Sequence, residues 1–587
     1  MLLISFLAMN FVKKIIVILL TLGFFNKSFA EDFAPSTQTG QVKFTEESTL
    51  TINSGVTLGS LTTQNRAHIN EQSDSSVTVN SGGTILSLNN AVQGADATRL
   101  TVTNSGTIRA AGSKAINLKD NIGSTITNNS GGIIRSGAGD AISGEQDTDD
   151  ETSGNTITNS GTIYSDDQRA INFFSDATTT TVTNNLAGHI YNSNTNETIK
   201  LDTSSTLTNS GKIENKNSAD NNSVLLIGDN NTVTLKDSGL VIGTIAADSG
   251  TSGNTLKIHH GVGQSYYYKT SGTFDLEDLD GNQIVKGSAG SVGQGGSETL
   301  DELLSYKTIN LRNFFNSYTN SNFYNNEGGW GEVYASNLNR DQSTTSKALE
   351  FELINIGANI IYPTENSNFV MAFEGGIQDF TKDYKINYQS LHGGIFTKEN
   401  ENFFDLETFL VTGVTLKDSE RKILTNTTSS GTLITDGNFQ TYAIHIGAKK
   451  NNSYIIPNVG FTSSFSVTPS YDETDYFSWR NRKVGNISFY LNDIYEIKKD
   501  ELSKLSINWD LNFRNLIGDE KQTYSINGTS ATYDQANDLT REISLLAGLG
   551  YEKYILDNGK VGFSINGKTT SQNTKGLSGN VSFKMNF

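Results

Sequence analysis

The chain has 587 residues, including 56 Gly but only 4 Pro and no Cys, and its formal net charge is −18. This length predicts at least two structural units. The lack of Cys excludes a disulfide scaffold and thiolate metal sites. The negative charge disfavours nucleic acid as a partner, because the two would repel each other.

The amino terminus carries an export signal. Lys13 and Lys14 precede an apolar run, and Ala30 ends a small-residue cleavage site. A transmembrane anchor is disfavoured, because spanning a bilayer takes about 20 apolar residues and this run is shorter. We expect residues 1–30 to be a signal peptide that is cleaved off, with Met9 as the better start.

Residues 31–222 repeat one phrase, which is clearest at 100–108 (LTVTNSGTI). An Asn closes each short Thr/Val/Ile stretch, at intervals of 24 to 31 residues. A repeat of this size predicts a solenoid, and apolar residues with period 2 instead of 3.6 predict a parallel β-solenoid. Stacked coils would align the repeated asparagines as a ladder at one corner. These asparagines are Asn53, Asn80, Asn104, Asn128, Asn159, Asn184 and Asn209.

One acidic insertion, Glu145 to Glu151 (EQDTDDE), interrupts the repeat. A calcium loop would need ordered Asp-x-Asp-x-Asp-Gly spacing and a terminal Glu, and neither is present. We therefore expect a solvated excursion from the solenoid. The stretch from Gly137 to Asp140 is only a fragment of a calcium-binding nonapeptide, and it is not iterated.

The repeat ends at residues 223–286, where longer apolar runs replace it. A solenoid needs an end that blocks further stacking, and this closing segment can supply it. Residues 287–296 (GSAGSVGQGG) are rich in Gly and Ser and predict a flexible linker.

Residues 297–326 switch to helical spacing. Thr299 and Glu302 match a capping box, and apolar residues recur up to Tyr318 with helical period. A helix over 299–318 would be about 30 Å long, close to the depth of a bilayer core. The segment is too polar to face lipid, so we expect it to lie inside a barrel.

Residues 327–587 divide into about twelve segments in which apolar and polar residues alternate, as in transmembrane β-strands. In the clearest segment, Ile507 and Phe513 are expected to face outward and Asp510 inward. The even number of segments predicts a closed antiparallel barrel. A lumen of this size should hold one helix of about 10–12 Å diameter.

The connections in this region alternate in length. Long ones at 418–437, 468–483 and 518–538 predict extracellular loops, and short ones such as 449–452 predict periplasmic turns. The apolar pattern changes phase at Leu353-Ile354, which predicts a β-bulge there.

The chain ends on an alternating stretch in which Val581, Phe583, Met585 and Phe587 are separated by polar residues. This stretch resembles the closing strand of Gram-negative outer-membrane β-barrels. The resemblance implies that these residues, and the terminal Phe587 above all, are the signal read by the barrel-assembly machinery.

The whole order of segments resembles a monomeric autotransporter of the type V secretion class. The resemblance implies an all-β fold, with a β-solenoid passenger joined by a lumenal helix to a twelve-strand barrel. It also implies transfer by the inner-membrane export system, insertion of the barrel into outer-membrane lipid and display of the passenger on the cell surface. Some members cleave themselves at paired Asn in the helix. Asn325-Asn326 lie beyond the predicted helix, so we expect the passenger to stay attached.

No motif predicts catalysis, a cofactor or a metal. The stretch Ala247 to Gly250 lacks the first Gly of a serine-protease motif, and only His68 and His189 precede it. His259-His260 have no carboxylate or Cys at metal spacing, so an exposed turn is expected there. His392 and His445 fall on predicted barrel strands, where a structural role is expected.

Two functions remain for the passenger. The first is an adhesin or self-association rod, whose rows of Asn, Thr and Ser bind glycans, surfaces or the same rod on a neighbouring cell. The alternative is an enzyme acting on polysaccharide, which would need acidic residues clustered on one face. Asp140 and the run at 145–151 are its only candidates.

Overall fold

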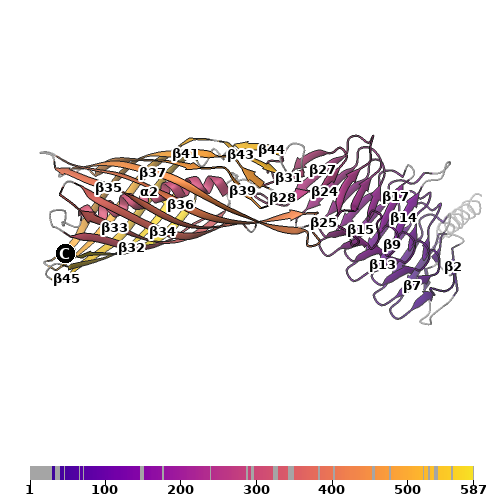
Figure 1. Cartoon of the computed structure of the whole chain (residues 1–587). Helices are drawn as coiled ribbons and strands as arrows, with labels where there is room; N and C mark the ends of the chain where they lie inside the picture. The colour runs from indigo at the N-terminus through magenta and orange to yellow at the C-terminus, as the bar shows by residue number, and fades with distance from the viewer. Residues whose placement is uncertain are drawn as a thin grey trace, which may run out of the picture. The chain divides into compact units, whose positions relative to one another are not determined.

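The computed structural model forms two compact units, a parallel β-solenoid and an antiparallel β-barrel (Figure 1). It describes residues 30–585 apart from 33–39, 45–46, 65–66, 70–71, 146–150, 175–176, 238, 286–288, 293–295, 321–327, 342–349, 366, 381, 383, 401–403, 453–456, 475–476, 501, 520, 527–528, 535–539 and 557–558. Residues 1–29 of the predicted signal peptide, residues 146–150 of the acidic insertion, Asn325-Asn326 and Phe587 lie outside the described residues.

Three parallel sheets form the faces of the solenoid, because each coil contributes one strand to each sheet. Sheet A contains β1 (Ala30–Asp32), β3 (Thr49–Ile52), β6 (Ser76–Val79), β9 (Thr101–Asn104), β12 (Thr125–Asn128), β15 (Thr156–Asn159), β18 (Thr181–Asn184), β21 (Thr206–Asn209), β24 (Thr232–Lys236), β27 (Thr255–His259) and β30 (Asp275–Asp278).

The other two sheets have shorter or fewer strands. Sheet B contains β4 (Thr57–Gly59), β7 (Thr84–Ser87), β10 (Thr107–Ala110), β13 (Ile133–Ser136), β16 (Thr162–Ser165), β19 (His189–Asn192), β22 (Lys212–Asn215) and β25 (Leu240–Ile242). Sheet C contains β2 (Val42–Lys43), β5 (Ala67–His68), β8 (Val92–Gln93), β11 (Ile116–Asn117), β14 (Ile142–Glu145), β17 (Ile171–Phe174), β20 (Ile199–Leu201), β23 (Asn222–Leu226), β26 (Thr244–Ala247) and β29 (Thr270–Ser271).

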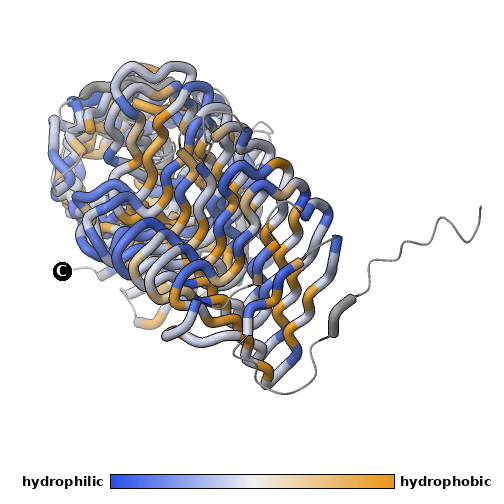
Figure 2. Tube along the Cα trace, turned by 90° about the vertical axis from the view of Figure 1, so that its right-hand side faces the viewer, coloured by the Kyte–Doolittle hydropathy of each residue, from blue (hydrophilic) through white to orange (hydrophobic). Residues whose placement is uncertain are grey.

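The solenoid core follows from the period of the repeat. In β12, Ile126 and Asn128 are fully buried, whereas Thr125 and Thr127 face outward. Ile126 lies in register with apolar residues of the coils before and after it. Burial of one such side chain contributes about 1.5–3 kcal/mol, and the repeat multiplies this gain. Figure 2 shows hydrophobic residues recurring at the same place in successive coils.

The barrel consists of twelve antiparallel strands, and the fold class predicted from the sequence is confirmed. The strands are β32 (Gly329–Arg340), β33 (Phe351–Pro363), β34 (Asn368–Phe380), β35 (Tyr384–Asn400), β36 (Phe404–Thr425), β37 (Thr432–Asn452), β38 (Asn458–Thr468), β41 (Arg482–Lys499), β42 (Ser503–Gly518), β45 (Arg541–Leu556), β46 (Gly559–Thr570) and β47 (Thr574–Met585). The last strand closes the barrel on the first, with paired residues running from Gly329↔Met585 to Arg340↔Thr574.

The predicted bulge at Leu353-Ile354 is wrong. Strand β33 pairs without a register shift on both sides, and its inward and outward residues alternate throughout. The pattern misled because Phe351 and Leu353 are apolar and yet point into the lumen, where they pack against Tyr306 of the helix. Register shifts occur instead at Glu496/Lys498 and Tyr554/Leu556.

The long connections are not simple loops. They continue the sheet beyond the barrel as the ends of β36 and β37 and as β39 (Tyr471–Glu473), β40 (Phe477–Trp479), β43 (Lys521–Ile526) and β44 (Thr529–Asp534). These hairpins enclose a small core of their own, which is why they are ordered. That core contains Val285, Val292, Ile423, Phe477, Trp479, Tyr524 and Ile526. At the opposite end, the short turn expected at 449–452 is still part of β37.

The predicted flexible linker is partly ordered in the same core. Its residues Ala289–Ser291 form β31, which pairs with β28 (Tyr266–Tyr268), and β28 also pairs with the end of β36. The Gly-rich composition of the linker did not reveal that Gly290 packs closely against the Ile526 side chain. A Cβ on Gly290 would lie 2.8 Å from the Ile526 side chain.

Helix α2 (Gly296–Asn320) starts three residues before the predicted Thr299, so the proposed capping box lies within the helix. Glu302 is instead ion-paired with Arg340 of the barrel wall. No helix among the described residues combines the length and apolar character that crossing a membrane requires.

Candidate functional site

The site that the fold builds is the barrel lumen with α2 inside it, as Figure 1 shows. The carboxyl-terminal half of the helix is apolar on the side that faces the first strands of the barrel. The ring of Phe315 stacks on Phe396 with centroids 4.8 Å apart and contacts Phe409 at 4.9 Å. The full cluster contains Leu311, Phe314, Phe315, Tyr318, Trp330, Ile361, Val370, Ala372, Phe396, Phe409 and Val411.

A second apolar cluster holds the earlier turns of the helix. Tyr306 and Ile309 pack against inward-facing wall residues, namely Leu338, Phe351, Leu353, Phe380, Tyr384, Ile386 and Tyr388. Apolar residues on the inside of a barrel would be unfavourable in a water-filled channel. Their presence is explained by the helix, which removes them from water.

Arg312 binds a later strand of the wall through its charge. Arg312 Nη2 lies 2.7 Å from Asp510 Oδ2, and Arg312 Nη1 lies 3.0 Å from Asn512 Oδ1. The guanidinium also lies over the Tyr490 ring, 3.9 Å from its centroid. Breaking a buried ion pair on one side leaves an uncompensated charge, so this contact fixes the position of the helix.

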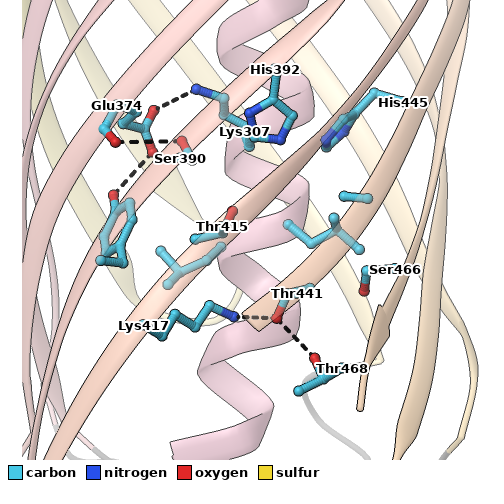
Figure 3. Close-up of a pocket in the computed structure, with 14 residues that line it drawn as sticks. Lys307, Glu374, Ser390, His392, Thr415, Lys417, Thr441, His445, Ser466 and Thr468 are labelled. Atoms are coloured by element: carbon cyan, nitrogen blue, oxygen red, sulfur yellow. Dashed lines mark hydrogen bonds and ion pairs between the residues drawn. The ribbon is translucent and has the colours of Figure 1, made fainter. Parts of the chain in front are cut away.

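Two further lysines connect the helix to the wall, and one of them, Lys307, contacts β34, a strand that also contributes to the apolar cluster. Lys307 Nζ of α2 lies 3.2 Å from Glu374 Oε2, and Figure 3 shows the side chain reaching across from the helix to the wall. Glu374 also accepts hydrogen bonds from the hydroxyls of Tyr334 and Tyr388. Lys449 of the wall donates to Asn316 of the helix at 2.7 Å.

His392 and His445 lie next to each other beside the helix, in a small cavity of 60 Å³, with ring centroids 5.3 Å apart (Figure 3). The Thr308 hydroxyl has one proton and donates it to Leu304 O, so it accepts from His445 Nδ1 at 2.9 Å. Nε2 of His445 is then a buried acceptor that no donor among the described residues reaches. The cavity has room for a few water molecules at about 10–15 Å³ each, and water can satisfy this nitrogen.

The outer surface of the barrel is apolar on every strand. Large apolar side chains are exposed on each of the twelve strands, for example Val333, Ile356, Phe373, Leu391, Leu410, Ile444, Phe461, Phe489, Phe513, Leu549, Phe563 and Val581. A soluble protein rarely exposes an apolar surface larger than a few hundred Å². An apolar belt outside and a polar lining inside are the arrangement of a barrel embedded in lipid.

The structure places the predicted closing residues on this belt. Val581 and Phe583 are exposed on the outer face, 43% and 42% respectively, and Val581 lies opposite Val333 across the closing seam. Met585 is the last described residue of β47, and nothing is described of its side chain.

The repeated asparagines form two ladders. Asn104, Asn128, Asn159, Asn184 and Asn209 are completely buried, and each of the first four donates from Nδ2 to Oδ1 of the next at 2.8 Å. Asn53 and Asn80 bond to each other at 3.1 Å but are exposed. The two ladders are separate because Val79, not Asn80, lies in register with Asn104.

Glycines after the asparagines make room for the buried ladder. A Cβ on Gly161 would lie 2.3 Å from Gly132 O and 2.7 Å from Asn128 Nδ2. The Asn-Ser-Gly repeat is therefore explained by a corner in which backbone and amide groups pack closely.

The structure does not assemble the weak catalytic motifs. His68 contacts Gln41, and His189 contacts Glu214, so neither is directed at Ser249. The exposed turn expected at His259-His260 is wrong, because His259 is the last residue of β27 and His260 is buried and bonds to the Tyr268 hydroxyl at 2.7 Å. Among the described residues, no group of three His, Cys, Asp or Glu side chains is placed to hold a metal ion.

The lumen contacts were not found from the sequence. The period of a strand shows which residues face inward, but the partner of Arg312 lies 198 positions away. The only available signal was the excess of apolar residues on inward positions of β33 to β36.

No family model and no curated protein matches this chain. Three similar solved structures are autotransporter domains. The translocator domain of NalP from Neisseria meningitidis has 13% identity and a TM-score of 0.34, and covers 49% of this chain and 98% of its own. The β domain of the Bordetella autotransporter BrkA has 10% identity and a TM-score of 0.28, covering 44% and 99%. The transport unit of AIDA-I from Escherichia coli has 10% identity and a TM-score of 0.29, covering 45% and 92%.

The monoaromatic hydrocarbon channel CymD and the toluene transporter TodX from Pseudomonas putida match with TM-scores of 0.27 and 0.28. We therefore base the function on the topology of this chain and on its lumen contacts.

Proposed function

We propose that the chain is a self-displaying autotransporter of the Gram-negative outer membrane. The observation that carries this proposal is a helix of 25 residues seated inside a closed barrel with an apolar outer belt, directly after a β-solenoid. A channel would keep its lumen open, whereas this lumen is filled by the segment that connects the solenoid to the barrel.

The barrel would insert into outer-membrane lipid after delivery by the inner-membrane export system and the barrel-assembly machinery. The solenoid would then cross and fold on the cell surface. Folding itself can bias this motion, because each coil buries apolar residues on the coil before it. The passenger would remain attached, since Asn325-Asn326 follow Asn320, where α2 ends.

The passenger would act as an adhesin or self-association rod instead of an enzyme. Asp140, a candidate acidic residue for polysaccharide hydrolysis, accepts hydrogen bonds from the Arg169 amide at 3.0 Å and from Asn172 Nδ2 at 2.8 Å. These contacts give Asp140 a structural role, because they hold the chain just before β14 against the next coil. Release of reducing ends from polysaccharide by the displayed chain would contradict the adhesin proposal.

Display can be tested on whole cells that express the full chain. We expect the chain in the outer-membrane fraction, with the solenoid cleaved by added protease and the barrel protected. A passenger that is cut only after cells are broken would contradict surface display. A barrel fragment of about half the mass in untreated membranes would contradict attachment of the passenger.

A further inference from the structure

Sheet A of the solenoid presents an outer face made almost entirely of threonine. In the eight strands from β3 to β24, the two outward positions that all of them share hold sixteen residues, and fifteen of these are Thr; β24 adds a third outward residue, Lys236. The sixteen are Thr49, Thr51, Ser76, Thr78, Thr101, Thr103, Thr125, Thr127, Thr156, Thr158, Thr181, Thr183, Thr206, Thr208, Thr232 and Thr234. We call these sixteen residues the threonine face.

The threonine face is a regular lattice. Residues of neighbouring coils lie directly in register, as in Thr125↔Thr156 and Thr127↔Thr158, so two straight rows run along the solenoid. Neighbours within a row are about 4.8 Å apart, and the two rows are about 6.6–6.8 Å apart. Sheet A strands such as β9, β15, β24 and β27 are labelled in Figure 1.

Strand propensity alone does not explain this composition. Thr favours strands, but the outward positions of sheet B belong to the same coils and are varied. One row of sheet B reads Leu86, Arg109, Arg135, Tyr164, Tyr191 and Glu214. Sheet B also shows that this solenoid tolerates charge and aromatic rings on an outer face. Sheet A therefore keeps Thr for a reason other than strand formation.

The threonine face is uncharged on a chain whose net charge is −18. Charge appears at the end of the face, where β24 ends on the exposed Lys236 and where Lys257 of β27 pairs with Glu277 of β30 at 3.1 Å. Two copies of the chain would repel each other through most of their surface, but not through this face. The face is thus suited to contact a second copy.

The hydroxyls of the threonine face are available for such a contact. Among the described residues, the hydrogen bond recorded between side chains of the face is Ser76 Oγ to Thr49 Oγ1 at 2.9 Å. Each hydroxyl can both donate and accept. Thr is also stiff at χ1, so little side-chain entropy is lost when the face is covered.

We propose that the threonine face is the surface through which the passenger binds a second copy of this chain on a neighbouring cell. This inference rests on the proposed display of the solenoid. Both copies carry the same repeat, so their rows match in spacing when the faces meet about a two-fold axis. Donor and acceptor hydroxyls can then pair along the whole length of the face.

The size of the face predicts a weak contact between single copies. Eight strands span roughly 34 Å and four residues roughly 13 Å, which gives about 900 Å² for two copies. Stable interfaces bury about 1,200–2,000 Å². Adhesion would therefore depend on many copies engaging between two cells, where multivalency raises the effective affinity.

The test uses cells that display the full chain. One variant carries Thr103→Lys, Thr158→Lys and Thr208→Lys on the threonine face, which lie in β9, β15 and β21. A second variant carries Asp at the same three positions. The matched control carries Thr84→Lys, Thr107→Lys and Thr162→Lys, the same change at outward positions of sheet B.

We expect cells with the unmodified chain to aggregate, and the Lys-face and Asp-face cells each to lose aggregation by at least about tenfold, because like charges would face each other. A mixture of Lys-face and Asp-face cells should aggregate again. The sheet B control should behave like the unmodified chain. A Thr→Val version of the three face positions keeps the shape but removes the hydroxyls, and it should also weaken aggregation.

Surface protease accessibility is measured on every strain, so a failure of display is seen separately from a failure of adhesion. Displayed chains that do not aggregate cells would overturn the inference and leave the proposed display intact. Equal aggregation by Lys-face cells would also overturn it. Attachment of displaying cells to cells that lack the chain would show that the partner is a surface glycan or another cell-surface molecule and not a second copy of this chain.

Discussion

Arg312 in the middle of the lumenal helix forms an ion pair with Asp510 on the barrel wall, with Nη2 and Oδ2 2.7 Å apart and both side chains more than nine-tenths buried. The Phe315 cluster contacts strands β32 to β36, whereas Arg312 contacts Asp510 on β42. The helix is thereby fixed in rotation as well as in depth. A segment that merely passed through the lumen would need no such pairing.

The first prediction concerns this ion pair. Arg312→Met should destabilise the barrel by about 3–5 kcal/mol, because it leaves the Asp510 carboxylate buried without a partner. The change in barrel stability is measured by unfolding the barrel in detergent and monitoring the loss of its compact form on gels.

The matched control is the double variant Arg312→Met with Asp510→Asn, which removes both charges. It should recover most of the lost stability, since no unpaired charge remains. If the single and double variants were both as stable as the unmodified chain, the helix would not be held by this pair.

The second prediction concerns the chain terminus. Phe587→Ser should lower the amount of barrel assembled in the outer membrane, because the resemblance to closing strands of outer-membrane barrels implies that the assembly machinery reads this residue. The fold of the solenoid should be unaffected. Membrane fractions blotted for the barrel report assembly.

Phe563→Ser supplies the comparison, because Phe563 is a Phe on the outer face of the barrel, 52% exposed, that lies on β46. It should lower assembly much less than Phe587→Ser if the terminus acts as a signal. Equal losses would show that only the apolar area matters.

The third prediction concerns the buried asparagine ladder. Asn159→Ala removes the donor to Asn184 and the acceptor for Asn128, which both lie at 2.8 Å. Leaving buried polar groups unsatisfied costs about 1–3 kcal/mol. Faster proteolysis of the displayed solenoid is expected.

Asn53→Ala is the control for the ladder. Asn53 is exposed and bonds only to Asn80, at 3.1 Å, among the contacts described for its side chain. Water can replace that bond, so proteolysis should stay close to the unmodified rate. If protease cleaved the solenoids of both variants at similar rates, burial of the asparagines would not determine how much the ladder contributes to stability.

The fourth prediction concerns pH. Burial lowers the pKa of His189 below its ordinary value of 6.5, against the opposing effect of Glu214 at 3.1 Å. The folded solenoid therefore binds this proton less readily than the unfolded chain. The contribution of His189 to stability is complete above pH 6.5 and is lost as the pH falls through the lower pKa of the folded state.

Proteolysis of the displayed solenoid at neutral pH and at about pH 5 tests this effect. His189→Thr is the matched variant, because Thr162 occupies the same row one coil earlier. It should show a weaker dependence on pH than the unmodified chain. An unchanged pH dependence would assign the effect to other groups.

The sequence by itself determined the period of every segment. Coils of 24 to 31 residues, one helix and about twelve alternating strands could be read from it, because the inward and outward positions of a strand or helix repeat at fixed spacing. The outward rows of Thr on sheet A and the apolar belt of the barrel follow from that period alone.

Only the tertiary structure decided which inward residues meet. The Leu353-Ile354 pattern looked like a bulge until the helix was seen to pack against Leu353, and the Gly-rich linker looked flexible until Gly290 was seen against Ile526. The Asn ladder broke between Asn80 and Asn104 because register depends on the whole coil. Periodicity is a property of one segment, whereas these contacts join segments that are distant in the chain, so their partners cannot be read from spacing.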